Sequence, residues 1–129
     1  MKLYRLFTIS LALAISTPVM ASEVFEGSFR TLPQFGGGKE KEYRLVIELI
    51  SVDGGKVQAK IASPDSMKCT REDEAAGRIS GNEISIRGKS EPELKGCGRL
   101  NFRGVRDGDL LVGTTFFEGK NQDIKLRKR

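Results

Sequence analysis

The sequence predicts an all-β fold, a small eight-stranded antiparallel up-and-down (meander) barrel with one disulfide. Apolar and polar residues alternate with a period of two along much of the chain, which is typical of strands with one buried face. Glycine, asparagine and aspartate stand at the joints between these runs, where they favour hairpin turns. The chain also has two cysteines and an N-terminus with the features of an export signal. A two-sheet β-sandwich is the alternative architecture.

Residues 1–21 have the order of a cleavable signal peptide. Lys2 and Arg5 precede a short apolar stretch, and small residues before Ser22 form a cleavage site. The apolar stretch is much shorter than the roughly 20 residues that a membrane-spanning helix needs, and no cysteine near the cut offers a point for lipid attachment. We therefore expect a periplasmic or secreted protein without a membrane anchor, in which residues 22–129 form a single β-barrel domain.

The first part of this domain contains three predicted strands. They cover residues 24–31, 43–52 and 56–63, and the turn Asp53-Gly54-Gly55 joins the last two. One face of each strand is apolar and should point inward. The inward residues are Phe25, Phe29, Tyr43, Leu45, Ile47, Leu49, Val57, Ala59 and Ile61.

The remaining strands follow in the same manner. They are expected at residues 77–80, 83–88, 99–106 and 110–117 and in a final strand that contains Ile124 and Leu126, while residues 64–75 and 89–95 are expected to be loops. Each strand is joined to the next, which is the order of a meander. Large apolar residues dominate the inward positions, so we expect a packed interior rather than a ligand cavity.

Cys69 and Cys97 are predicted to form one disulfide. Both lie in the exported part of the chain, and an oxidising compartment favours their pairing. No Cys-x-x-Cys motif and no histidine is present that would support a redox or metal pair instead. The bridge would close a long loop and should contribute about 3.6 kcal/mol in the chain-entropy treatment.

Several kinds of chemistry are excluded by composition. The chain has no histidine, which rules out Ser-His-Asp and Cys-His nucleophilic systems, and oxidised cysteines would rule out the usual zinc sites. Carboxylates occur together at residues 72–74 and at Asp107 and Asp109. Solvation and turn chemistry explain both groups, so we expect a protein that is not an enzyme, with no catalytic residue, metal or cofactor.

One group of residues predicts a binding surface. The net charge is +5, and it becomes +3 when Lys2 and Arg5 are removed, because 20 basic and 17 acidic residues then remain. Arg99, Asn101 and Arg103 alternate with apolar residues and should share the outward face of one strand. Arginine suits bidentate contacts with carboxylate or phosphate. The candidate surface for an anionic partner consists of Arg87, Arg99, Asn101, Arg103 and Arg106.

These observations favour an exported, non-catalytic binding module that acts through its surface or loops as an inhibitor-like or accessory protein. Its partner is expected to be a protein or an anionic envelope glycan, and the protein itself is expected to be a monomer. No nucleic-acid partner is expected, because the chain leaves the cytoplasm. A carrier that holds a small ligand in the barrel interior is the alternative, and a carboxylate-dependent hydrolase is a third possibility.

Overall fold

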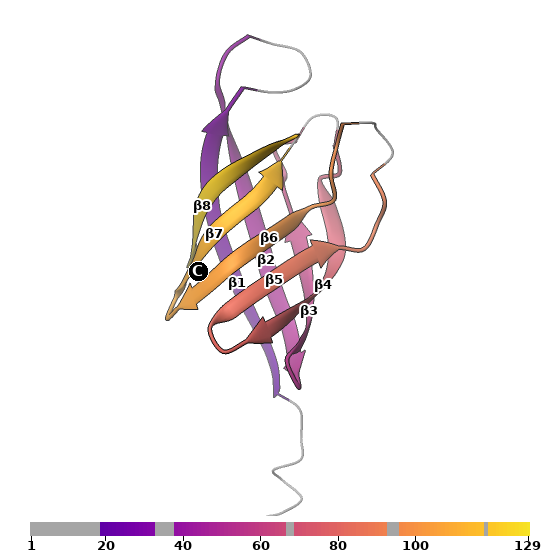
Figure 1. The fold of residues 1–129 in the computed structure, drawn as a ribbon, viewed down its shortest axis with the longest axis vertical. Helices are drawn as coiled ribbons and strands as arrows, with labels where there is room; N and C mark the ends of the chain where they lie inside the picture. Colours follow the sequence, from indigo (N-terminus) through magenta and orange to yellow (C-terminus); the bar gives the residue numbers. More distant parts are fainter. Residues whose placement is uncertain (1–18, 33–37, 67–68, 93–95, 118) are drawn as a thin grey trace, which may run out of the picture.

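The computed structural model describes residues 19–32, 38–66, 69–92, 96–117 and 119–129 (Figure 1). Antiparallel strands pair in chain order, and the first strand also pairs with the last, so the sheet closes into a barrel. This confirms the predicted eight-stranded meander in place of the two-sheet sandwich, and the described residues contain no helix. The strands are β1 (Val19–Thr31), β2 (Lys41–Asp53), β3 (Lys56–Ala62), β4 (Glu72–Ser80), β5 (Glu83–Gly88), β6 (Asn101–Asp107), β7 (Leu110–Phe117) and β8 (Lys120–Lys128). Residues 1–18, which make up most of the predicted signal peptide, lie outside the described residues.

Tight turns join three of the hairpins and set their register. Gly54 and Gly55 link β2 to β3 with φ values of 59° and 83°. Gly81 links β4 to β5 and Gly108 links β6 to β7, with φ values of 63° and 62°. Residues that carry a side chain rarely adopt a positive φ angle, so glycine is the residue that these turns require.

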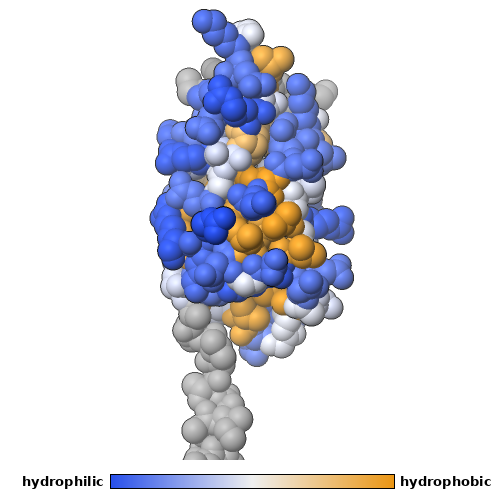
Figure 2. Space-filling view, turned by 90° about the vertical axis from the view of Figure 1, so that its left-hand side faces the viewer, coloured by the Kyte–Doolittle hydropathy of each residue, from blue (hydrophilic) through white to orange (hydrophobic). Residues whose placement is uncertain are grey.

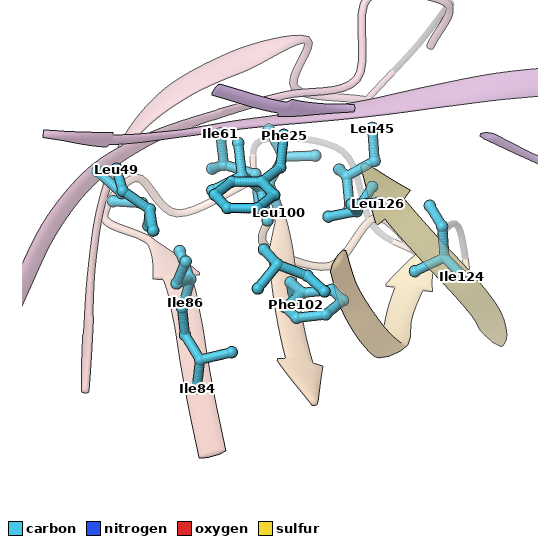
Figure 3. Packing of buried hydrophobic residues seen from close by; sticks show 14 of the residues in the cluster. Phe25, Leu45, Leu49, Ile61, Ile84, Ile86, Leu100, Phe102, Ile124 and Leu126 are labelled. Atoms are coloured by element: carbon cyan, nitrogen blue, oxygen red, sulfur yellow. The ribbon is translucent and has the colours of Figure 1, made fainter. Parts of the chain in front are cut away.

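The barrel interior is packed with apolar side chains. The inward positions predicted in β2 and β3 are all buried, as are Ile84 and Ile86 in β5, whereas Ile79 in β4 is only partly buried. In Figure 3 the side chains of Phe25, Phe102 and Leu126 point into the same interior from β1, β6 and β8. Each is no more than 1% exposed. Alternation along the strands therefore places one continuous hydrophobic core inside the closed sheet.

An aromatic cluster lies within this core. The ring of Phe117 packs edge-on against Phe29, with centroids 5.0 Å apart, and at a tilt against Tyr43, at 4.6 Å. Phe29 and Tyr43 stack with centroids 5.8 Å apart. Such offset and edge-to-face arrangements stabilise aromatic pairs beyond the burial of their surface. The cluster joins β1 and β2 to β7.

The barrel closes where β1 meets β8. Phe25 pairs with Lys128 and Glu26 with Arg127 along this seam. Gly27 lies so close to β8 that a Cβ atom there would be 2.1 Å from the carbonyl oxygen of Lys125. The absence of a side chain at residue 27 therefore allows the two strands to approach.

The structure corrects one predicted loop. Residues 64–75 were expected to be a loop, but β4 begins at Glu72. Asp73 is half-buried, and its carboxylate accepts hydrogen bonds of 2.8 Å from both the backbone N–H and the hydroxyl of Ser90. A polar residue at this position interrupts the apolar alternation, and its hydrogen bonds satisfy it once the strand has formed.

The predicted disulfide is confirmed. The Sγ atoms of Cys69 and Cys97 are 1.99 Å apart, and their Cα atoms are 5.7 Å apart. Cys69 lies in the connection between β3 and β4, and Cys97 lies in the connection between β5 and β6. The bridge therefore ties together two connections at one end of the barrel, next to the segment that leads into Arg99 (Figure 1).

Candidate anion-binding face

Four of the five predicted surface residues lie together on the outer face of β5 and β6. Arg87 in β5 pairs directly with Asn101 in β6, and Ser85 pairs with Arg103. Arg99 comes two residues before Asn101 along the same chain segment. Arg87, Arg99, Asn101 and Arg103 all line one hollow of about 490 Å³. The alternation that predicted this shared face is thus supported by the register of the strands.

Asn101 organises the start of this face. Its side-chain amide donates to the carbonyl oxygens of Arg99 and Phe116, at 2.7 and 3.2 Å. The Asn101 Oδ1 atom accepts a hydrogen bond of 3.0 Å from the backbone N–H of Phe116. These bonds join the segment before β6 to β7, so we assign Asn101 a positioning role rather than a ligand-binding role.

Arg99 is held by its own surroundings. Its guanidinium donates to the carbonyl oxygens of Gly88 and Lys89, at 3.5 and 3.4 Å. It also forms an ion pair with Glu91 in the same connection. The side chain is only 25% exposed, so much of its bonding capacity already serves to hold the connection between β5 and β6.

Arg106 does not join the group. It is three residues beyond Arg103, so the pleat of the strand turns it toward the inside of the barrel. There its guanidinium lies over the ring of Phe25, 5.1 Å from the centroid, and makes two hydrogen bonds to the carboxylate of Glu23, at 3.0 and 2.8 Å. Arg106 therefore belongs to the end of the core and not to the outer face.

Glu23 collects a second cation at the same place. The Nζ atom of Lys128 lies 3.1 Å from Glu23 Oε2. The hydrogen bond from Arg106, aided by Lys128, lowers the pKa of Glu23 from 4.5 to about 2, and burial opposes this shift. The same hydrogen bond raises the pKa of Arg106. We call Glu23, Arg106 and Lys128 the closing cluster, because they link β1, β6 and β8 across the end of the barrel.

Further cations extend the face beyond β5 and β6. The register aligns Lys56 in β3 with Arg78 in β4, Arg78 with Ser85 in β5, and Ser85 with Arg103 in β6. A row of outward side chains therefore crosses four strands and carries three positive charges. The sequence pattern did not predict that Lys56 and Arg78 lie in this row. We define the basic band as Lys56, Arg78, Arg87, Lys89, Arg99 and Arg103.

A second and larger hollow lies along this band. It has a volume of about 900 Å³ and adjoins the first, since Arg87 and Arg99 line both. Ala76 of β4 lines the larger hollow between Gln58 of β3 and Arg87 of β5. Its small methyl side chain leaves the hollow open at this point. Asp53 is the one acidic residue in either lining as described. The two hollows therefore form a continuous depression with a strongly positive border.

The charges of the basic band are largely unneutralised. Within the described part of the chain, the side chains of Arg78, Arg87 and Arg103 have no ion pair and no hydrogen bond, and the same holds for those of Lys56 and Lys89. Most ion pairs lie elsewhere, around β1, β2 and β8. They are Arg30–Glu40, Arg44–Asp65, Arg106–Glu23, Lys128–Glu23 and Arg129–Glu26. Among the cations of the basic band, Arg99 alone has an acidic partner in the described part of the chain, Glu91, and the other five have none.

The carboxylates considered for catalysis are dispersed by the fold. Glu72 and Glu74 point outward from β4, while Asp73 between them is bonded to Ser90. Asp107 and Asp109 flank the exposed hairpin turn at the other end of the barrel. Across residues 19–129, outside the gaps, no cluster of acidic residues or cysteines is arranged to hold a metal ion.

Apolar residues are also exposed outside the basic band. Val105 and Val112 pair across β6 and β7 and are each 38% exposed. Figure 2 shows the side of the molecule on which β1 and β8 lie, where apolar residues gather in one patch among hydrophilic ones. The outer surface is therefore basic over β3–β6 and partly apolar on the side of β1 and β8.

Comparison of the chain with protein-family models and with curated protein sequences finds no match. In the ranges that the structure describes, no helix has the length and apolar character needed to traverse a bilayer.

Proposed function

We propose that the protein is an exported, non-catalytic binding module that docks an anionic partner on the basic band. The observation that carries this proposal is the set of unneutralised cations that border two adjoining hollows. Unpaired arginine side chains on a preformed surface offer bidentate contacts to carboxylate, sulfate or phosphate groups. The partner is an anionic component of the envelope, either a protein or a glycan, and the module acts in an accessory or inhibitor-like manner.

The packing of the barrel supports action through the surface. The largest inward side chains, among them Phe25, Tyr43 and Phe102, are at most 1% exposed and fill the interior. Both hollows instead lie on the outside of the sheet, lined mainly by residues of β3–β6, with Ser51 and Asp53 of β2 and Phe116 of β7 at their borders. A surface partner therefore has prepared contacts, and for this reason we place docking ahead of the carrier and the hydrolase.

The test is capture of partners from an envelope extract by the secreted protein and by an Arg87→Glu/Arg103→Glu variant. These two arginines are chosen because they have no partners in the described part of the chain, whereas replacing Arg99 would also release its bonds to the connection before β6. The matched control is Lys125→Glu/Arg127→Glu, which makes the same change in net charge on the exposed side of β8.

The proposal predicts that capture is lost in the first variant and retained in the control. It also predicts that capture by the wild type weakens as salt is raised, because exposed charges are screened over roughly 8–10 Å at physiological ionic strength. Equal capture by all three proteins, at low and high salt alike, would remove the basic band from consideration.

A further inference from the structure

We infer that the anionic partner is an acidic polysaccharide that lies across β3–β6 with its oxyanions paired to the basic band. The inference rests on the proposed function and adds the chemical class of the partner. Either carboxylate or sulfate groups would supply the oxyanions, since arginine and lysine contact both in the same way.

The distribution of the charges favours an extended ligand. Lys56 and Arg103 stand three strand spacings apart, which is roughly 14 Å at about 4.8 Å for each spacing. Arg87 lies between them but one step further along the strands, because it pairs with Asn101 rather than with Arg103. The cations are therefore spread along a zigzag line and do not converge on one point. A single phosphate or carboxylate could meet only a part of the band, whereas a chain with regularly spaced charges could meet all of it.

The closed barrel argues against an acidic peptide. Peptides often bind a sheet by adding a strand to its edge, and β1 and β8 pair with each other, so the sheet has no open edge at their seam. The basic band also lies on the face of the sheet, away from that seam. The strongest contacts of a protein partner commonly come from buried anchor residues in well-packed pockets, whereas the larger hollow presents cations around the small Ala76.

The smaller hollow has features that suit a sugar ring. Phe116 borders it and is 41% exposed. Its ring packs over Gly98, where a Cβ atom would come within 3.1 Å of the ring. Arg103 and the hydroxyl-bearing Ser85 line the same hollow. A sugar presents an apolar face of C–H groups and an edge of hydroxyls, so an exposed aromatic plate beside polar donors matches both.

The same residues distinguish a polysaccharide from single-stranded nucleic acid. Binding of single strands uses several aromatic side chains on which successive bases stack. In the described lining of the two hollows, Phe116 is the exposed aromatic residue, and the other exposed side chains are charged, polar or small. The single exposed aromatic ring of Phe116 can stack against one sugar ring, and the remaining contacts to the ligand are ionic.

The experiment measures fluorescence anisotropy of labelled polygalacturonate and labelled dextran sulfate with the secreted protein. Neutral dextran, poly-glutamate and oligothymidylate are the comparison probes. We expect at least one of the two acidic polysaccharides to bind, with affinity that rises from short to long chains until the four strands are spanned. Neutral dextran should not bind, and poly-glutamate and oligothymidylate should bind at least about tenfold more weakly.

Two variants test the place of binding. Arg87→Glu/Arg103→Glu should weaken polysaccharide binding by more than about tenfold. The slope of log K against log salt concentration should fall by about two, which is about one for each lost ionic contact. Phe116→Ala should weaken polysaccharide binding while its salt dependence stays unchanged, and Lys125→Glu/Arg127→Glu should match the wild type. Melting temperatures within a few degrees of wild type establish that the variants are folded.

The outcomes separate this inference from the proposed function. If neither polysaccharide binds, while poly-glutamate or an envelope protein binds in a manner that needs Arg87 and Arg103, the polysaccharide is wrong and the docking module stands. Equal binding of oligothymidylate and polysaccharide would likewise overturn the inference. If no anionic partner responds to Arg87→Glu/Arg103→Glu, both proposals fail.

Discussion

Glu23 connects β1 to β6 and β8 at the end of the barrel, and the change Glu23→Gln tests how much the closing cluster stabilises the fold. The carboxylate accepts two hydrogen bonds from Arg106 and lies 3.1 Å from Nζ of Lys128. Glutamine has nearly the same shape but no charge, so the variant removes the ionic contribution and leaves two cations without a carboxylate.

The magnitude follows from the pKa of Glu23, which falls from 4.5 to about 2. Each pKa unit corresponds to about 1.4 kcal/mol, which gives an upper limit of about 3 kcal/mol. The side chains of Glu23, Arg106 and Lys128 are 23%, 32% and 36% exposed, and solvent screening reduces the contribution to about 1–2 kcal/mol. Because the folded-state pKa is lowered, this stabilisation is present above pH 4.5 and is lost as the pH falls to about 2.

The assay is urea unfolding of wild type and Glu23→Gln at a series of pH values from neutral to acidic. The free energies of unfolding should differ by about 1–2 kcal/mol at neutral pH and converge near the pKa of about 2. Glu40→Gln is the control, because Arg30 and Glu40 form a pair in which both side chains are 59% exposed, and its effect should be small at every pH. A difference for Glu23→Gln that does not change with pH would refute the linkage argument.

Three further predictions concern the scaffold. Reduction of the Cys69–Cys97 bridge should lower the free energy of unfolding by about 3.6 kcal/mol, measured by urea unfolding with and without reductant; an unchanged midpoint would contradict a stabilising bridge. Gly27→Val should cost more than about 2 kcal/mol, because its Cβ would overlap a carbonyl oxygen of β8 at 2.1 Å, whereas Gly38→Val, with nothing within 4 Å of the Cβ position, should melt close to wild type. Intact-mass measurement of secreted protein should show Ser22 as the first residue, and material that retains residues 1–21 would disprove the predicted cleavage.

The inward side chains could be predicted because alternation reports burial directly. Leu45, Ile47 and Leu49 stand two residues apart and are buried on one face of β2. The start of β4 could not be predicted in this way. Asp73 takes an inward position, and only its hydrogen bonds to Ser90, which is far away along the chain, make a carboxylate acceptable there. Interactions of this kind have no periodic signature in a sequence.

The candidate face was predictable within single strands but not across them. The pleat already places Arg103 and Arg106 on opposite faces, so parity alone was a signal that Arg106 belongs inside. The two-residue turn at Gly81 also implies that Arg78 lies beside Ser85. The alignment of Lys56 with Arg78 depends on the register of β3 and β4, whose connection is long, and a long connection leaves register open. The full basic band therefore needed the three-dimensional structure.

The pairing of β1 with β8 has a consequence for the order in which the protein folds. Glu26 and Arg129, which bond across the seam, are separated by 103 residues, so the barrel cannot close until nearly the whole chain has left the ribosome and any export channel. Until then β1 has an exposed edge, and such edges invite association with other chains. Glu23 and Glu26 place two negative charges on that edge, and charged side chains on an edge strand oppose edge-to-edge pairing. The same two carboxylates that bind cations of β6 and of the last residues in the folded barrel are thus expected to disfavour wrong pairing of β1 while the last strand is still missing.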